Sequence, residues 1–419
     1  MFKKLQGGTW LVAAMGLAIS LPATAANWAQ AFYSPGHTAF NPGETTLSPT
    51  NVSGLQLLWG NSSVGGATNV ALVDGTLYVE GGTNNDQIAA IDAATGSTLW
   101  SVANGDGSVP AVSGIAVGSG LVHAACGLTD SGGRGYGTIC AYRRANGKLA
   151  WKYSSGCNCA PEVFVSPFVL SDSTLYFGYY SGGAYGTQVF AAVDAQTGGT
   201  IWTDNTGNLG SVGPGAPAVG NGYVYFDCYL SNNDFQGICA LSQSDGSLSW
   251  SLNLDSGASG LTALQNNLFV NALGESEVLA LDGATGAQLW SYPYSSSPSG
   301  PDFPPALAKG VLYVLDGNNN MYALHAGSGK LIWSGASENV STPSVANGVL
   351  YADGGAHRDT DPTVYAYSTQ TGDVLWRAPT RTWTALDPPP LVANGTLYLT
   401  NAPCGTICAY GLASGTAKR

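Results

Sequence analysis

Residues 90–100 read Ala-Ile-Asp-Ala-Ala-Thr-Gly-Ser-Thr-Leu-Trp, and variants of this phrase recur along the chain and decide its fold. In seven copies a Gly stands four positions before a Trp. These pairs are Gly96/Trp100, Gly147/Trp151, Gly198/Trp202, Gly246/Trp250, Gly286/Trp290, Gly329/Trp333 and Gly372/Trp376. A second apolar phrase, such as Gly75-Thr-Leu-Tyr-Val79, precedes each copy. One repeat is therefore a supersecondary unit that becomes stable only when neighbouring repeats stack on it.

The spacing of the repeats indicates blades of a propeller. Beginning with Trp59, successive Trp residues are 41, 51, 51, 48, 40, 43 and 43 residues apart, which is typical of a four-stranded blade. In the sixth repeat we expect strands at 305–308, 311–315, 321–324 and 330–333, separated by Gly- and Asn-rich turns. No helical periodicity competes with this pattern in the mature chain.

The two ends of the chain complement each other. Residues 55–59 resemble a fourth strand with no strands before it, whereas the last repeat has strands at 391–393, 396–400 and 406–410 but no closing Trp. The sequence therefore predicts an all-β fold, an eight-bladed propeller of four-stranded antiparallel blades whose last blade is closed by the N-terminal strand.

The domain organisation follows from the same reading. Residues 1–25 carry two Lys, a short apolar run and the small-residue site Ala23-Thr24-Ala25, which predicts a cleaved signal peptide. Residues 26–54 form an N-terminal extension, and 55–419 a single propeller domain. We expect no membrane span, because no later apolar run is long enough, and no lipid anchor, because the first Cys is Cys126. The protein is expected to be exported, either periplasmic or extracellular, and monomeric.

The net charge limits the classes of binding partner, and the cysteines indicate disulfides. The formal net charge is −12 and only 10% of residues are charged, so nucleic acid and anionic lipid would be repelled. Eight Cys in an exported chain favour disulfides over metal ligation. Three pairs are expected to join neighbouring strands of one blade: Cys126/Cys140, Cys228/Cys239 and Cys404/Cys408. Cys157 and Cys159 form either a tight ring or two free thiols.

The repeated Trp residues are expected to be structural. A large aromatic at the end of each outermost strand can wedge between blades, and a Gly four residues earlier suits a turn with positive φ. This role is assigned to Trp59, Trp100, Trp151, Trp202, Trp250, Trp290, Trp333 and Trp376. Trp383 falls outside the pattern.

The phrase Ala/Asp-x-x-Thr-Gly-x-x-x-Trp, paired with Gly-x-Leu-Tyr, resembles the pyrroloquinoline-quinone (PQQ)-type propeller repeat. The resemblance covers nearly all of the mature chain. It implies the propeller fold, and the family it points to includes quinoprotein alcohol dehydrogenases, the propeller lipoprotein of the outer-membrane β-barrel assembly machinery and many exported proteins of unassigned role.

Function is expected on one face of the disc. The turns between the first and second strands and between the third and fourth are tight, whereas the opposite face carries the longer loops, where binding residues concentrate. Ligand-binding candidates there are Arg134, Tyr179, Tyr185, His357, Arg358, Asp359, Asp361, Arg381 and Trp383, and further polar or aromatic candidates are Tyr136, Glu162, Asp234, Phe235 and Asp387. The run 357–361 is either an ion-binding loop or a self-paired hairpin tip.

Two functions remain open at this stage. The first is a binding or scaffold module for a protein or glycan, with no cofactor and no metal, and we favour it over an enzyme. The alternative is a PQQ- and Ca²⁺-dependent dehydrogenase that oxidises an alcohol or sugar. That enzyme needs cations converging on an anionic cofactor, oxygen ligands for the metal and a general base, but only Arg134, Arg358 and Arg381 point to the candidate face. No catalytic residue is assigned.

Overall fold

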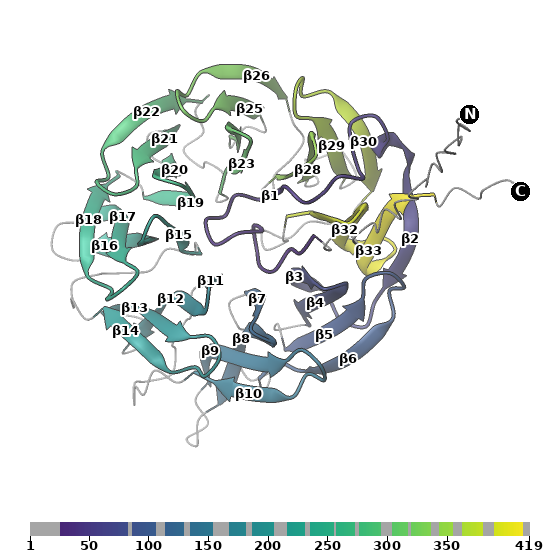
Figure 1. Ribbon diagram of the computed structural model, residues 1–419, viewed down its shortest axis with the longest axis horizontal. Helices are drawn as coiled ribbons and strands as arrows, with labels where there is room; N and C mark the ends of the chain where they lie inside the picture. The colour runs from purple at the N-terminus through teal and green to yellow at the C-terminus, as the bar shows by residue number, and fades with distance from the viewer. Residues whose placement is uncertain are drawn as a thin grey trace, which may run out of the picture.

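The computed structural model confirms the predicted fold: eight four-stranded antiparallel blades are arranged in a ring, and a short parallel strand extends one of them (Figure 1). The structure describes residues 26–82, 86–105, 114–129, 135–153, 167–181, 187–204, 216–230, 235–254, 257–272, 276–294, 304–316, 320–336, 343–354, 363–379 and 389–413. The only helix in these ranges is the short 3-10 turn η1 (Val52–Gly54). No helix in the described part of the chain is long and apolar enough to cross a membrane.

The first four blades follow one another along the chain, each running from the innermost strand to the outermost. Their strands are β3 (Ala67–Val73), β4 (Thr76–Gly81), β5 (Gln87–Asp92) and β6 (Thr98–Ala103); β7 (Ile115–Gly118), β8 (Leu121–Thr129), β9 (Gly135–Arg143) and β10 (Leu149–Lys152); β11 (Val169–Ser171), β12 (Thr174–Ser181), β13 (Thr187–Asp194) and β14 (Thr200–Asp204); β15 (Ala218–Gly220), β16 (Tyr223–Leu230), β17 (Phe235–Ser242) and β18 (Leu248–Asn253).

The remaining four blades complete the ring, and the last of them is composite. Their strands are β19 (Ala258–Leu264), β20 (Asn267–Ala272), β21 (Glu277–Asp282) and β22 (Gln288–Pro293); β23 (Ala306–Ala308), β24 (Val311–Leu315), β25 (Asn320–His325) and β26 (Leu331–Ala336); β27 (Ser344–Ala346), β28 (Val349–Gly354), β29 (Thr363–Ser368) and β30 (Val374–Pro379), with the short β1 (Phe40–Asn41) beside β27; β31 (Leu391–Ala393), β32 (Thr396–Ala402), β33 (Gly405–Leu412) and β2 (Leu55–Asn61). The N-terminal strand β2 pairs with β33, as predicted.

Apolar packing lies between blades. The buried side chains of the described residues form eight clusters, and each cluster combines residues from two neighbouring blades. A single blade therefore has no core of its own, which is why the repeats must stack.

The Gly–Trp pattern of the sequence builds the seams between blades. Each Gly adopts positive φ in the turn before the outermost strand, and the indole that lies on it comes from the preceding blade. A methyl group on Gly286, for example, would lie 2.7 Å from the ring of Trp250. The close approach and the left-handed backbone both require glycine there.

A hydrogen bond anchors the indole in seven seams, and the exception has a visible cause. Each of seven Trp Nε1 groups donates to a backbone carbonyl of the next blade, as Trp250 does to Gly283 at 2.9 Å. Trp151 has no such partner. In that seam His123 stands where other blades have Tyr or Phe, and its Nε2 lies 2.8 Å from the carbonyl oxygen of Ala195, the position the indole uses elsewhere.

Disulfides brace three blades at the loop end. Cys126–Cys140 joins β8 to β9 and Cys228–Cys239 joins β16 to β17. The third bridge, Cys404–Cys408, differs from the sequence expectation in one detail, because Cys404 lies in the turn after β32 rather than in the strand. Cys157 and Cys159 lie outside the described residues. Disulfides persist in oxidising compartments, which favours an extracytoplasmic protein.

Candidate functional site: the ring centre and the two faces

The two faces of the ring carry different sets of connections between strands. One face, here called the turn face, carries tight turns such as Asp74-Gly75 and Asn394-Gly395, in which both residues have positive φ. The opposite loop face carries the connections between second and third strands and between consecutive blades. Most of these connections lie outside the described residues.

Of the ligand-binding candidates predicted from the sequence, the structure describes only Tyr179. Tyr179 on β12 is buried against Tyr153 and Phe177, and burial raises the pKa of its hydroxyl. The other ligand-binding candidates lie outside the described residues, namely Arg134, Tyr185, His357, Arg358, Asp359, Asp361, Arg381 and Trp383. For Tyr136 and Phe235 the structure describes only the strand backbone.

The centre of the ring is occupied by the chain itself. Residues 26–41, here called the central segment, cross the middle of the disc among the innermost strands (Figure 1). They contact one equivalent position in the innermost strand of every blade. This position lies four residues before the first residue of the second strand, as Leu72 does before Thr76, and directly opposite the second residue of that strand. These eight inner-edge residues are Leu72, Val117, Leu170, Val219, Ala263, Leu307, Val345 and Val392.

The contacts are hydrogen bonds made in blade order. Seven inner-edge N–H groups, from Leu72 to Val345, donate to seven successive acceptors of the central segment at 2.8 Å. The acceptors are the backbone carbonyls of Trp28, Ala29, Pro35, Gly36, Thr38 and Ala39 and the side-chain Oε1 of Gln30. At the eighth blade Asn41 Nδ2 donates to the Val392 carbonyl at 2.7 Å. One inner-edge residue of each blade is therefore hydrogen-bonded to this one segment.

Side chains of the central segment fill the same space. Trp28 is 1% exposed and meets Tyr33 edge to face, with ring centroids 5.2 Å apart. His37 is buried beside Phe32, its Nδ1 lies 3.2 Å from the Leu261 carbonyl, and burial lowers its pKa to about 4. The His37 imidazole is therefore uncharged at neutral pH.

The backbone of the central segment is strained. Phe32, Tyr33, His37 and Ala39 all have positive φ, between 48° and 72°, a region that non-glycine residues seldom adopt. Such conformations persist only where surrounding contacts determine them, and the inner-edge hydrogen bonds provide those contacts. Gly36 is required for a different reason: a Cβ there would overlap the Ala263 carbonyl oxygen.

Sequence reasoning missed this arrangement. The extension was recognised as residues 26–54, but its partners are backbone groups spread from Leu72 to Val392. No residue pattern marks such partners. The single signal is its density of small and turn-forming residues, which permits a path through a crowded centre.

A buried carboxylate links the first two blades near the loop face. Glu80 on β4 is fully buried, and its Oε2 accepts from the N–H of Gly114 at 2.8 Å, at the start of the next blade. Asn104 lies beside it and donates to the Ala125 carbonyl at 2.7 Å. The pair therefore holds two blades together.

Asp227 occupies the same strand position in the fourth blade and differs chemically. It is only partly buried, next to the disulfide-bonded Cys228, and burial raises its pKa to about 7, with an opposing hydrogen bond from the Ala258 backbone. A carboxyl of this kind can give or take a proton near neutral pH. Sequence analysis did not single it out.

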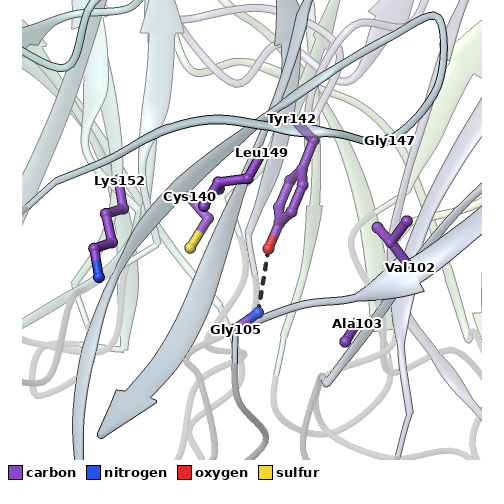
Figure 2. Close-up of a pocket in the computed structure, with 8 residues that line it drawn as sticks. All are labelled: Val102, Ala103, Gly105, Cys140, Tyr142, Gly147, Leu149 and Lys152. Atoms are coloured by element: carbon purple, nitrogen blue, oxygen red, sulfur yellow. Dashed lines mark hydrogen bonds between the residues drawn. The ribbon is translucent and has the colours of Figure 1, made fainter. Parts of the chain in front are cut away.

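A cavity of about 300 Å³ lies in the seam between the first two blades (Figure 2). Its lining residues are Val102, Ala103, Gly105, Cys140, Tyr142, Gly147, Leu149 and Lys152. The Tyr142 hydroxyl accepts from the Gly105 N–H at 3.2 Å and donates to Asn104 Oδ1 at 3.0 Å, and burial raises its pKa to about 12. The lining offers one charged side chain, Lys152, and the hydroxyl is already committed, so this cavity is a poor site for catalysis.

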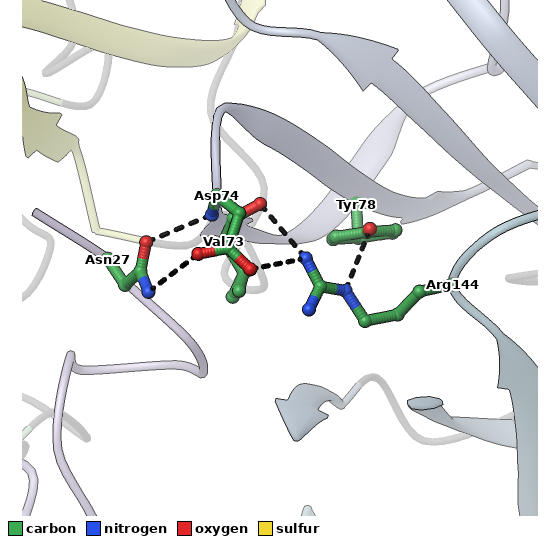
Figure 3. Close-up of polar contacts among 5 residues, drawn as sticks. All are labelled: Asn27, Val73, Asp74, Tyr78 and Arg144. Atoms are coloured by element: carbon green, nitrogen blue, oxygen red, sulfur yellow. Dashed lines mark hydrogen bonds and ion pairs between the residues drawn. The ribbon is translucent and has the colours of Figure 1, made fainter. Parts of the chain in front are cut away.

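The Arg144 guanidinium is likewise committed to structure (Figure 3). Its Nη2 lies 3.0 Å from Asp74 Oδ2, and its Nε donates to the Tyr78 hydroxyl at 3.1 Å. Asp74 in turn accepts and donates hydrogen bonds with Asn27 of the central segment. The cluster ties the central segment to two blades on the turn face.

The dehydrogenase alternative depends on metal ligands and on cations near the ring centre. In the described ranges no group of three or more His, Cys, Asp and Glu residues is placed to hold a metal. The described cations lie in turn-face turns, on outermost strands or, for Arg143, at the turn-face end of the third strand β9. They are Arg143, Arg144, Lys148, Lys152, Lys309, Lys330 and Arg377. None of these cations lies on an innermost strand. The space between the innermost strands is filled by the central segment.

Comparison with known proteins defines the family. A family model described as outer membrane protein assembly factor BamB matches residues 46–189 and 186–416. Tetrathionate hydrolase of Acidithiobacillus ferrooxidans is 24% identical over 382 residues, which cover 81% of this chain and 71% of that protein. The quinohemoprotein alcohol dehydrogenase ADH IIB of Pseudomonas putida is 27% identical over 148 residues, 31% of this chain and 21% of that protein.

Solved structures show the same architecture at low identity. The quinohemoprotein alcohol dehydrogenase ADHIIG of Pseudomonas putida HK5 matches with a TM-score of 0.70 at 15% identity, covering 94% of this chain and 81% of that one. BamB of Moraxella catarrhalis matches with a TM-score of 0.57 at 14% identity, covering 87% and 99%. At these identities the likeness establishes the fold alone.

Proposed function

We propose that this chain, which belongs to the PQQ-like propeller family described as outer membrane protein assembly factor BamB, is an extracytoplasmic binding module that recognises a polypeptide through its loop face. The observation that carries the proposal is the occupied ring centre. Because the central segment is hydrogen-bonded to one inner-edge residue of every blade, we assign partner recognition to the connections of the loop face.

The partner is proposed from chemistry and family together. A net charge of −12 disfavours anionic partners, whereas aromatic and hydroxyl side chains of the loop segments suit a neutral, extended polypeptide. BamB relatives are named for assembly of outer membrane proteins. We therefore take an unfolded outer-membrane β-barrel polypeptide as the test partner, and a glycan as the competing ligand.

The experiment measures binding of that polypeptide to the purified protein by interferometry. The double variant Arg381→Ala/Trp383→Ala alters the loop face, and Lys330→Ala, an exposed turn-face residue, is its matched control. We expect the double variant to weaken binding at least tenfold and the control to bind as the wild type does. Equal binding by all three proteins, or binding of glycan alone, would contradict the proposal.

A second function is supported by one specific observation, the carboxyl of Asp227. One relative that spans most of both chains is a tetrathionate hydrolase. A partly exposed carboxyl with a pKa of about 7 is able to act as a general acid over the acidic range. Hydrolysis of tetrathionate is therefore the enzymatic candidate, with Asp227 as its proton donor.

The assay follows thiosulfate release from tetrathionate between pH 3 and 7. Asp227→Asn removes the titrating proton, and Asp172→Asn is the control, because Asp172 is exposed in a turn with φ of 53° that Asn tolerates. Activity in the wild type and control that disappears in Asp227→Asn would favour the enzyme over the binding module. No release by any of the three proteins would exclude it.

Quinone-dependent oxidation remains the weaker enzymatic alternative, since the described cations lie away from the ring centre. Addition of PQQ and Ca²⁺ to the purified protein tests it directly. Micromolar binding together with dye reduction by an alcohol or aldose would reverse this ranking.

A further inference from the structure

We infer that the inner rim of the ring is a binding site for an extended polypeptide and that residues 26–41 are its built-in ligand. The site consists of the eight inner-edge residues, and its chemistry is one backbone group presented by each blade toward the centre. This inference does not depend on the proposed loop-face partner, because it concerns different residues.

Repetition of one contact is the first argument. The inner-edge residues occupy the same position in all eight repeats, and seven of them donate an N–H to the central segment at 2.8 Å. Each acceptor lies further along the central segment than the last, so that the segment and the blades run in the same order. Recognition of backbone by backbone at a strand edge is the way sheets bind added peptides.

Separate anchoring of the ligand is the second argument. Between β1 and the propeller strand β2, Pro42, Gly43, Thr45 and Thr46 are exposed, as are Pro49 and Thr50. The central segment therefore joins the ring through an accessible connection, and its contacts with the blades are non-covalent. Glu44, by contrast, is buried and its Oε2 accepts from the Gly395 N–H at 2.8 Å, which fixes the connection to the eighth blade.

Side chains give the site its specificity. Trp28 packs in the cluster between the eighth and first blades. Both atoms of the Gln30 amide bond the backbone of Leu170, with Oε1 accepting its N–H at 2.8 Å and Nε2 donating to its carbonyl at 3.0 Å. At Gly36 the segment approaches the ring so closely that no side chain fits. A peptide of arbitrary sequence would lose these three features.

The first experiment uses the full chain with a protease site inserted between Pro49 and Thr50. After folding and cleavage, we expect the N-terminal fragment that ends at Pro49 to co-elute with the ring and to exchange with a labelled synthetic peptide of residues 26–49. A competing peptide with Trp28→Ala should be more than tenfold weaker than the wild-type peptide, and one with Thr45→Ala, an exposed residue, should compete as well as wild type. Loss of the fragment on cleavage, or equal competition by a scrambled peptide, would overturn the inference.

The second experiment measures hydrogen exchange in the uncut protein and needs no peptide. The inner-edge amides from Leu72 to Val345 should exchange slowly, and in Trp28→Ala they should exchange together at least tenfold faster. Amides that pair second and third strands within a blade, such as Val79 with Ala89, serve as the internal control. Unchanged exchange of the inner-edge amides in the variant would show that they do not depend on the segment.

Discussion

Replacement of His37 by Asn should change how the stability of the protein depends on pH. His37 lies in the central segment, is 2% exposed, and has a φ of 59°, which Asn adopts more readily than most residues. Burial lowers the pKa of the folded His37 from 6.5 to about 4. Between pH 6.5 and pH 4 the imidazole therefore binds a proton in the unfolded chain but not in the folded one. The stability that the neutral imidazole contributes is complete above pH 6.5 and is lost as the pH falls toward 4.

The size of the effect follows from the shift. One pKa unit corresponds to about 1.4 kcal/mol, so the lowered pKa of His37 should make the folded state lose ~3 kcal/mol between pH 7.5 and pH 4 through this group alone. The Asn variant has no titrating group at this position. It should be less stable than the wild type at pH 7.5 by ~1–2 kcal/mol, because a smaller side chain leaves space beside Phe32. At pH 4 it should be more stable than the wild type by ~1–2 kcal/mol, because the ~3 kcal/mol that the wild type loses exceeds the initial deficit.

The assay is guanidinium unfolding of both proteins at pH 4, 5, 6 and 7.5, followed by Trp fluorescence. The decisive quantity is the difference in free energy of unfolding between variant and wild type at each pH, because contributions of the other titrating groups cancel in it. A difference that stays constant within about 0.5 kcal/mol across the range would refute a buried, neutral His37.

Three further predictions test the remaining structure. Asp227→Asn should gain stability relative to the wild type as the pH rises from 4 to 8, because the raised pKa of about 7 means that the folded protein resists ionisation that the unfolded chain accepts above its ordinary value; thermal unfolding at both pH values checks the sign. Gly286→Ala should cost ~2–4 kcal/mol, since its Cβ would meet the Trp250 ring as well as strain the backbone, whereas Gly310→Ala, with similar φ but open space around it, should cost only ~1 kcal/mol in chemical denaturation. Gly60→Ala should destabilise the composite eighth blade by more than ~2 kcal/mol, because its Cβ would overlap the Cys404 carbonyl, while Gly335→Ala in the outermost strand of the sixth blade meets nothing within 4 Å; equal melting temperatures would contradict closure by β2.

The sequence is informative wherever one blade repeats another. The seven Gly–Trp pairs predict the seam packing, because each copy obeys the same steric requirement. Together with the unpaired Trp59 they also predict the blade number. An alignment of the repeats shows that His123 replaces an aromatic residue. Its effect on the Trp151 indole is seen only in the structure, because the Ala195 carbonyl that His123 contacts belongs to another blade.

The candidate site is less predictable for a physical reason. The central segment makes its hydrogen bonds mainly through backbone atoms, which every residue except Pro presents in the same form. Contacts such as Asn41 with Val392 join residues 351 positions apart. The raised pKa of Asp227 is similarly a property of its surroundings, and the sequence around it is that of an ordinary strand.

The path of the central segment has a consequence for how such a ring can evolve. Its hydrogen-bonding groups are placed in order against eight successive blades. Duplication or deletion of one repeat would therefore shift every later contact and leave one inner-edge residue without its partner. The length of the central segment is therefore matched to the number of blades in the ring. Lineages carrying it should keep their blade number constant, and any relative with another count should have a segment of matching length or none.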